Sequence, residues 1–195
     1  MSDPTKLARY LSLEGKNVFI TGGGTGIGAA IVTAFVEQGA HVAFVDVAEA
    51  ESRALASQLA SGSKAKIWWR TCDVRDVAAL QAATNDAARE LGDFSVLVNN
   101  VARDDRHTLE SVTPEYWDAV MAVNVRGVYL GCNLFSPAMV ARGSGHIVNI
   151  TSMGGFITLL FVLEHVVFGS QAHRPVVLFD ALPDHTVATP DSKDA

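Results

Sequence analysis

The sequence has only two cysteines, Cys72 and Cys132, and six scattered histidines among its 195 residues. The cysteines lie far apart and neither has a partner at metal-ligand spacing, so we expect two reduced, half-buried thiols instead of a disulfide or a metal site. No two histidines are spaced to share one turn of a helix, so no structural zinc is expected. These shortages argue against a metalloprotein and against a small disulfide-linked scaffold.

Clusters of basic residues and long apolar runs are missing as well. The chain carries 15 Lys and Arg residues against 21 Asp and Glu residues, a net charge of −6, which argues against nucleic acid as a partner. No run approaches the roughly 20 apolar residues of a membrane helix. Residues 1–15 contain no apolar signal core, so we expect a cytoplasmic protein that binds neither membrane nor nucleic acid.

What the sequence does contain is a regular alternation of strand and helix patterns. Its length indicates one domain, and 49% apolar with 18% charged residues is typical of a globular chain. Alternating strands and helices predict right-handed crossovers and a doubly wound α/β fold whose parallel sheet is covered on both faces. The predicted strands are 18–21, 41–46, 66–71, 95–98 and 147–151, and the helices include 48–60, one capped by Asp76, and one from Thr113 to about Ala141.

The fold is organised around a glycine-rich stretch that follows the first predicted strand. Residues 18–28 read VFITGGGTGIG, and apolar residues then recur at helical spacing until Gly39. This pattern predicts a strand, a phosphate-binding loop and a helix. Glycines allow a tight turn and a close approach of backbone to a pyrophosphate, and the free N–H groups at the helix start attract the anion.

An acidic residue closes the second predicted strand. Asp46 follows the glycines by about 20 residues, the spacing at which a carboxylate accepts the ribose 2′-hydroxyl of a dinucleotide. The same carboxylate repels a 2′-phosphate. We therefore expect NAD as cofactor in preference to NADP.

Further motifs follow in order along the chain. They are Thr21-Gly22-x-x-x-Gly26-x-Gly28, Asp46, Asp73-Val74, Asn99-Asn100-Val101-Ala102, Asn124, and Ser152 after the last predicted strand. With these motifs, the chain resembles the short-chain dehydrogenase/reductase family from about Leu13 to Gly155. The resemblance implies a single-domain Rossmann-like sheet and hydride transfer between a nicotinamide cofactor and an alcohol or carbonyl compound.

The resemblance also assigns cofactor contacts by matching position. Gly22, Gly26, Ile27 and Gly28 are expected at the pyrophosphate, Asp46 at the adenosine ribose, and Asp73 with Val74 at the adenine edge. Val101 and Ala102 stand where the family usually has alanine and glycine. The whole implied cofactor-binding set is Thr21, Gly22, Thr25, Gly26, Ile27, Gly28, Asp46, Asp73, Val74, Asn99, Asn100 and Val101.

A charged loop follows the fourth predicted strand. Residues 103–107 read RDDRH and look like the corresponding loop of sugar 1-dehydrogenases of this family. Charged donors and acceptors suit a polyhydroxylated ligand, so the resemblance implies a small alcohol or sugar as substrate. A solvated surface loop is the alternative interpretation.

The family's catalytic groups are only partly present. The resemblance assigns Asn124 and Ser152 as catalytic residues, with a tyrosine base thirteen residues after the serine and a lysine four residues further on. Those two positions hold His165 and Gly169, and no tyrosine follows Ser152. Histidine has a suitable pKa for a base, but Gly169 supplies no cation to support it. We therefore predict impaired or absent catalysis.

The pattern changes character near residue 158. We divide the chain into an NAD-binding Rossmann domain at 1–158 and an atypical, truncated or altered segment at 159–195. Three explanations are open: a shifted reading frame or exon end, a divergent member that binds a dinucleotide without catalysis as a sensor or interaction protein, or replacement of tyrosine by His165. A homo-oligomer is possible, although the helix that normally forms the family's subunit interface is not recognisable.

Overall fold

The computed structural model describes residues 8–105 and 111–151, which belong to one compact unit, Met1–Thr151. Predictions that fall on residues 152–195, including Ser152, His165 and the domain boundary at 158, lie outside the described residues. A short helical turn, η2 (Leu11–Leu13), precedes the regular elements. These are β1 (Asn17–Thr21), α1 (Gly26–Glu37), β2 (His41–Asp46), α2 (Glu49–Gly62), β3 (Ile67–Thr71), α3 (Val77–Leu91), β4 (Val96–Asn99), α4 (Pro114–Met121), the π-helical segment η4 (Ala122–Arg126), α5 (Gly127–Arg142) and β5 (His146–Asn149).

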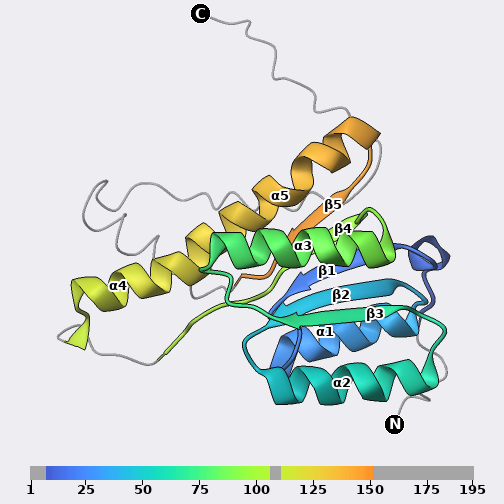
Figure 1. The fold of residues 1–195 in the computed structure, drawn as a ribbon, viewed down its shortest axis with the longest axis horizontal. Coiled ribbons are helices and arrows are strands. Elements are labelled where there is room, and N and C mark those ends of the chain that lie inside the picture. The colour runs from blue at the N-terminus through green and yellow to red at the C-terminus, as the bar shows by residue number, and fades with distance from the viewer. Residues whose placement is uncertain (1–7, 106–110, 152–195) are drawn as a thin grey trace, which may run out of the picture. The chain divides into compact units, whose positions relative to one another are not determined.

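The five strands form one parallel sheet in the order β3-β2-β1-β4-β5 (Figure 1). The order reverses between β1 and β4, because β2 and β3 extend the sheet to one side and β4 and β5 extend it to the other. Thr21 pairs with Val45 on one side and with Asn99 on the other. All strands therefore end at the same edge, and the loops after β1, β2 and β4 meet there.

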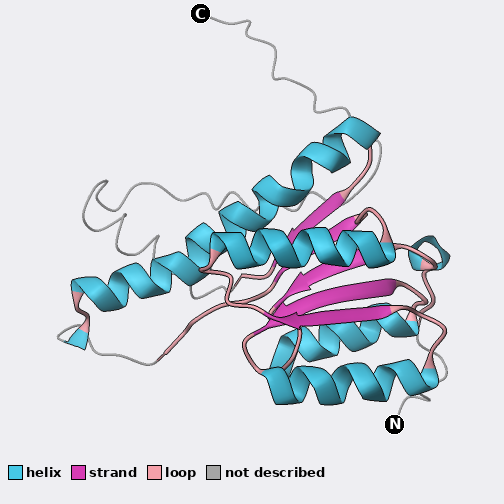
Figure 2. Cartoon of the chain, viewed as in Figure 1, coloured by secondary structure: helices cyan, strands magenta, loops and turns pink. Residues whose placement is uncertain are grey.

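Helices cover both faces of the sheet, with α1 and α2 on one face and α3 and α5 on the other (Figure 2). Side chains of β1 alternate between the two covers, because successive strand residues point to opposite faces. Val18 and Ile20 pack under α1 and α2, whereas Phe19 packs under α3 and α5. This arrangement confirms the predicted Rossmann-like doubly wound α/β fold.

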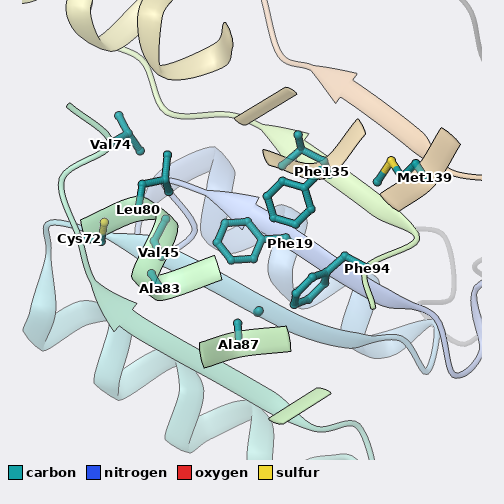
Figure 3. Close-up of a cluster of buried hydrophobic side chains, with 12 residues drawn as sticks. Phe19, Val45, Cys72, Val74, Leu80, Ala83, Ala87, Phe94, Phe135 and Met139 are labelled. Carbon is teal, nitrogen blue, oxygen red and sulfur yellow. The ribbon is translucent and has the colours of Figure 1, made fainter. Parts of the chain in front are cut away.

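An aromatic cluster anchors the face beneath α3 and α5. The rings of Phe19 and Phe94 meet edge to face with centroids 5.4 Å apart, and Phe135 of α5 lies 4.9 Å from Phe19 (Figure 3). All three side chains are buried. Such pairs add to the stability gained by burial alone, so β1, the segment that leads into β4, and α5 are held together beneath the sheet.

Three details differ from the sequence expectations. The helix predicted from Thr113 to about Ala141 is divided by η4, whose wider turn contains Asn124. The strand predicted at 147–151 is β5, which spans His146–Asn149. Cys72 is buried, not half-buried, whereas Cys132 is partly exposed as expected, and both are free thiols. Within the described ranges, no helix is long and apolar enough to cross a membrane.

Candidate dinucleotide site

The loop between β1 and α1 is shaped by its glycines. Gly22 has a φ of +68°, a conformation that residues with a Cβ rarely adopt. A Cβ at Gly28 would overlap the carbonyl oxygen of Gly22 and would lie 2.7 Å from the Asn100 amide nitrogen. The start of α1 is therefore drawn tightly against the end of β1, which only glycine permits.

The first N–H groups of α1 lie at this loop. An α-helix leaves its first N–H groups without intrahelical partners. Thr25 stands at the N-cap, yet its side chain makes no capping hydrogen bond in the part of the chain that the structure describes. Thr25, Gly26 and Ile27 are exposed, whereas Gly28 is buried. The loop thus presents donors and the positive end of the helix dipole to an anion.

Asp46 is held beside this loop by two backbone donors. One oxygen of its carboxylate accepts a hydrogen bond from Gly24 N at 2.8 Å, and the other accepts one from Ala48 N at 2.9 Å. A carboxylate has about four acceptor positions. Asp46 is half-buried, so its carboxylate is fixed in orientation and keeps acceptor capacity for a hydroxyl group.

The loop after β4 is tied to the glycine-rich loop. The Asn100 side-chain amide donates to the carbonyl oxygens of Thr21 and Gly22 at 3.2 and 2.9 Å. The Thr21 hydroxyl accepts from the backbone N–H groups of Asn100 and Val101 at 3.1 and 3.3 Å. These bonds use groups of four predicted cofactor residues within the protein, so their contribution here is to fix the two loops against each other.

Asn99 is likewise turned into the protein. Its side chain is buried, and its amide donates to Oδ1 of Asn149 at 2.9 Å. The side-chain oxygen of Asn99 has no partner among the described residues. A Cβ at Gly131 of α5 would collide with that oxygen, so glycine at this position lets α5 approach the end of β4.

A cavity of about 230 Å³ opens between the ends of β2, β3 and β4. Its walls combine apolar side chains with two aspartates and two arginines, and Asp46 stands at one side. The lining residues are Asp46, Val47, Cys72, Asp73, Val74, Arg75, Val101, Ala102, Arg103 and Val123. Larger hollows of about 490 and 600 Å³ lie against α1 and along α4, away from the glycine-rich loop.

Asp73 and Arg75 form an ion pair in this cavity. The Arg75 guanidinium donates to both carboxylate oxygens of Asp73, the shortest contact being Nη2 to Oδ2 at 2.6 Å. These hydrogen bonds hold the pKa of the Asp73 carboxyl below its ordinary value, so the group is ionised at neutral pH. Burial raises the pKa of the neighbouring Cys72 thiol, with added repulsion from Asp76 and Asp73, which keeps this thiol protonated and unreactive.

Asn124 lies in η4 and binds the backbone of the loop after β4. Its side-chain oxygen accepts from Arg103 N at 2.7 Å, and its amide donates to Arg103 O at 2.9 Å. Arg103 is paired with Asp105 and stacks on the ring of Tyr116, with 5.2 Å from Cζ to the ring centroid. The described part of the predicted substrate loop is therefore ordered by contacts from α4 and η4.

The structure brings together most of the residues predicted from the motifs. The glycine-rich loop, Asp46, Asp73, Val74 and Val101 gather at one edge of the sheet. Sequence reasoning missed Val47, Arg75 and Val123 as cavity residues. The only available signal for Arg75 was its position two residues after Asp73, which lets both side chains project from the same turn.

The fold and the glycine-rich loop at this edge define a Rossmann-like α/β framework. The family model for short chain dehydrogenases matches residues 16–163. The chain therefore belongs to the short-chain dehydrogenase/reductase family, whose members bind nicotinamide dinucleotides and act on small alcohols or sugars.

Similar proteins include sugar dehydrogenases and cofactor complexes. The chain is 43% identical over 152 residues to the probable galactose dehydrogenase GalD of Rhizobium meliloti, covering 78% of this chain and 59% of the relative. The structure of a 3-oxoacyl-[acyl-carrier protein] reductase with bound NAD from Brucella melitensis matches with a TM-score of 0.72 and 33% identity, covering 80% of this chain and 60% of that one. A metagenomic short-chain oxidoreductase in complex with NADP matches with a TM-score of 0.68 and 34% identity, covering 74% and 65%.

Proposed function

We propose that the chain binds NAD across the carboxyl edge of the sheet and that its turnover of an alcohol or sugar is severely reduced or absent. The observation that carries the cofactor assignment is the Asp46 carboxylate, which is fixed beside the glycine-rich loop by Gly24 N and Ala48 N. Residues 1–158 are the proposed NAD-binding domain, and 159–195 are an atypical segment.

The shape of the edge fits a dinucleotide. The first N–H groups of α1, at Gly26, Ile27 and Gly28, suit a pyrophosphate, because glycine leaves room for backbone to approach it. The cavity beside Asp46 is lined by both apolar and charged side chains, which suits the flat adenine ring with Asp73 and Val74 at its edge. The dinucleotide supplies hydride transfer at its nicotinamide, and this chain's residues bind and orient it.

NAD is proposed in preference to NADP because of charge. The remaining acceptor capacity of Asp46 suits two ribose hydroxyls, whereas a 2′-phosphate would place a charge of about −1.5 to −2 beside an anion. The positive charge of Arg75, which attracts a phosphate, is compensated by the negative charge of Asp73. A group bound at the ribose 2′ position would therefore meet mainly the negative charge of the Asp46 carboxylate.

The proposed substrate class is a small sugar or polyol. The 43% identity to a probable galactose dehydrogenase supports it, as does the charged loop that begins at Arg103. The chain spans about 59% of that relative's length, and the relative's activity is carried over only as part of this proposal.

Impaired turnover is proposed from two positions in the sequence. Oxidation of an alcohol releases a proton together with the hydride, and a positioned base contributes about 10²–10⁴-fold to such steps. The family's tyrosine and lysine positions hold His165 and Gly169. Asn124 and Ser152 are the proposed remaining catalytic residues, and neither takes up that proton.

The cofactor assignment is tested by the substitution Asp46→Ala. Calorimetric titration should show NAD affinity falling by about 10- to 100-fold, because a charge-assisted pair of ribose hydrogen bonds is lost. NADP affinity should fall less or rise, because repulsion of the 2′-phosphate is also removed. Asp93→Ala serves as the matched control, since the side chain of Asp93 is 80% exposed and its one ion pair within residues 8–105 and 111–151 is with Arg142 at 3.6 Å.

Equal losses for NAD and NADP in Asp46→Ala would refute the ribose assignment. Absence of NAD binding in the unaltered chain would refute the proposed function as a whole.

A further inference from the structure

Among the described residues, Arg75 occupies most of the acceptor positions of the Asp73 carboxylate. Oδ1 accepts from Arg75 N at 2.9 Å and from Nε at 3.0 Å, while Oδ2 accepts from Nε at 2.9 Å and from Nη2 at 2.6 Å. A carboxylate offers about four acceptor positions. Because three N–H groups of Arg75 are directed at them, a ligand amine competes with Arg75 for this carboxylate.

Both partners are accessible to a ligand in the cavity. The side chains of Asp73 and Arg75 are 35% and 48% exposed, and both line the cavity with Val74 and Val101. An ion pair exposed to this degree is held by a small free energy. Arg75 can therefore be displaced from Asp73 at modest cost, and its guanidinium stays within the cavity.

We propose that Arg75 is a specificity-determining residue, which competes with the adenine amino group for Asp73 and so weakens the selection of adenine over a 6-oxopurine. This inference rests on the proposed function, which puts the purine base in the cavity. The adenine amino group is a donor and needs the Asp73 carboxylate. The oxygen of a 6-oxopurine is an acceptor and is served by the Arg75 guanidinium without disturbing its bond to Asp73.

The ion pair therefore offers an acceptor, Asp73, to the adenine amino group and a donor, Arg75, to the oxygen of a 6-oxopurine. Without Arg75, only the acceptor remains: the oxygen of a 6-oxopurine loses its donor and lies beside the Asp73 charge, whereas an adenine amino group no longer competes with Arg75. The expected consequence of removing Arg75 is tighter binding of adenine dinucleotide and weaker binding of hypoxanthine dinucleotide.

The test compares NAD with nicotinamide hypoxanthine dinucleotide by calorimetric titration of the full chain and of Arg75→Gln. In the unaltered chain the two dissociation constants should be similar. In Arg75→Gln the ratio of the hypoxanthine to the adenine value should rise by about five-fold or more, which corresponds to the loss of an exposed ion pair and of one guanidinium hydrogen bond. The matched control is Arg89→Gln, because Arg89 forms an exposed ion pair with Asp86 at 2.6 Å in α3 and does not line the cavity.

A second variant ties the effect to the carboxylate. In an Asp73→Asn background, Arg75→Gln should leave the ratio unchanged, because a coupled pair shows its interaction only when both partners are present. Thermal melting of each variant verifies that it is folded.

The outcomes distinguish a failure of this inference from a failure of the proposed function on which it rests. If NAD binds but Arg75→Gln does not raise the ratio, the competition by Arg75 is refuted and the proposed function stands. If the unaltered chain binds neither dinucleotide, the proposed function falls and this inference falls with it.

Discussion

Individual glycines of the glycine-rich loop determine how closely neighbouring parts of the chain can approach the loop. At Gly24, a Cβ would overlap the Ser52 hydroxyl, and at Gly28 it would overlap the carbonyl oxygen of Gly22. The Ser52 hydroxyl is buried without a partner among the described residues, so little space remains beneath the loop. The loop's conformation therefore depends on the absence of side chains at both positions.

We predict that Gly28→Ala removes NAD binding and lowers the free energy of unfolding by about 1–3 kcal/mol, as overpacking of a filled site does. The added methyl group must displace both Gly22 and the Asn100 side chain. The carbonyl oxygen of Gly22 belongs to the backbone, so it cannot rotate away as a side chain can. Urea denaturation and NAD titration measure the two effects.

Gly62→Ala is the control for Gly28→Ala. Gly62 is the last residue of α2, and a Cβ there meets nothing within 4 Å. Alanine favours helix over glycine by up to about 1 kcal/mol, so stability should hold or rise. Unchanged NAD binding in Gly28→Ala would contradict the role given to this loop.

At the residue scale, sequence patterns predicted the groups whose position follows from chain order. Asp46 closes a strand adjacent to β1, so its place beside the loop follows from the parallel topology. The Asp73–Arg75 ion pair could not be predicted, because it depends on a side-chain conformation in a turn. The link between Asn124 and Arg103 depends on how α4 packs against a loop more than ten residues earlier, which no local pattern encodes.

Among the elements, the helix containing Asn124 differs most from its sequence pattern. The capping hydroxyl of Thr113 and Pro114 correctly marked its start, where Thr113 Oγ1 accepts from Tyr116 N at 3.2 Å. The π-helical turn η4 interrupts it at 122–126. A π-helical turn has no apolar periodicity of its own, and it is retained where tertiary contacts support it. Here Asn124 gains two hydrogen bonds to the Arg103 backbone.

We predict that Asn124→Ala lowers stability by about 1–3 kcal/mol, because two backbone groups of Arg103 lose their partners. The loop after β4 should loosen, so amide hydrogen exchange at residues 101–105 should accelerate. Mass spectrometry of peptides covering this loop measures the change.

Asn85→Ala provides the comparison for Asn124→Ala. Asn85 is exposed on α3 and accepts only from Gln81 Nε2 at 3.0 Å among the hydrogen bonds of the described residues. This substitution should change the free energy of unfolding by no more than about 0.5 kcal/mol. It should leave the rates of amide hydrogen exchange at residues 101–105 unchanged. Equal exchange rates at 101–105 in Asn124→Ala and the unaltered chain would show that η4 does not order this loop.

For the molecule as a whole, alternation of strands and helices predicted the layers and the edge of the sheet at which the candidate site lies. The alternation works because a parallel sheet needs a crossover between neighbouring strands, and a helix is the usual crossover. Strand ends were less certain, because β5 has few buried residues to mark them. His146, Val148 and Asn149 are exposed in this strand.

The proposed loss of turnover rests on the groups expected for proton transfer. The described edge of the sheet gathers the first N–H groups of α1 and the Asp46 carboxylate, which serve the proposed binding of a pyrophosphate and a ribose. The tyrosine and lysine positions of the family hold His165 and Gly169. The account therefore predicts that binding and turnover are separated in this protein.

Parallel measurement of NAD binding and of NADH formation tests this separation most directly. The unaltered chain is titrated with NAD by calorimetry, and the same preparation, saturated with NAD, is mixed with a panel of aldoses and polyols while NADH absorbance is recorded. The account predicts one NAD bound per chain and no NADH formation above the rate without protein. Turnover within the ordinary enzyme range of about 1–10³ s⁻¹ with any member of the panel would contradict it.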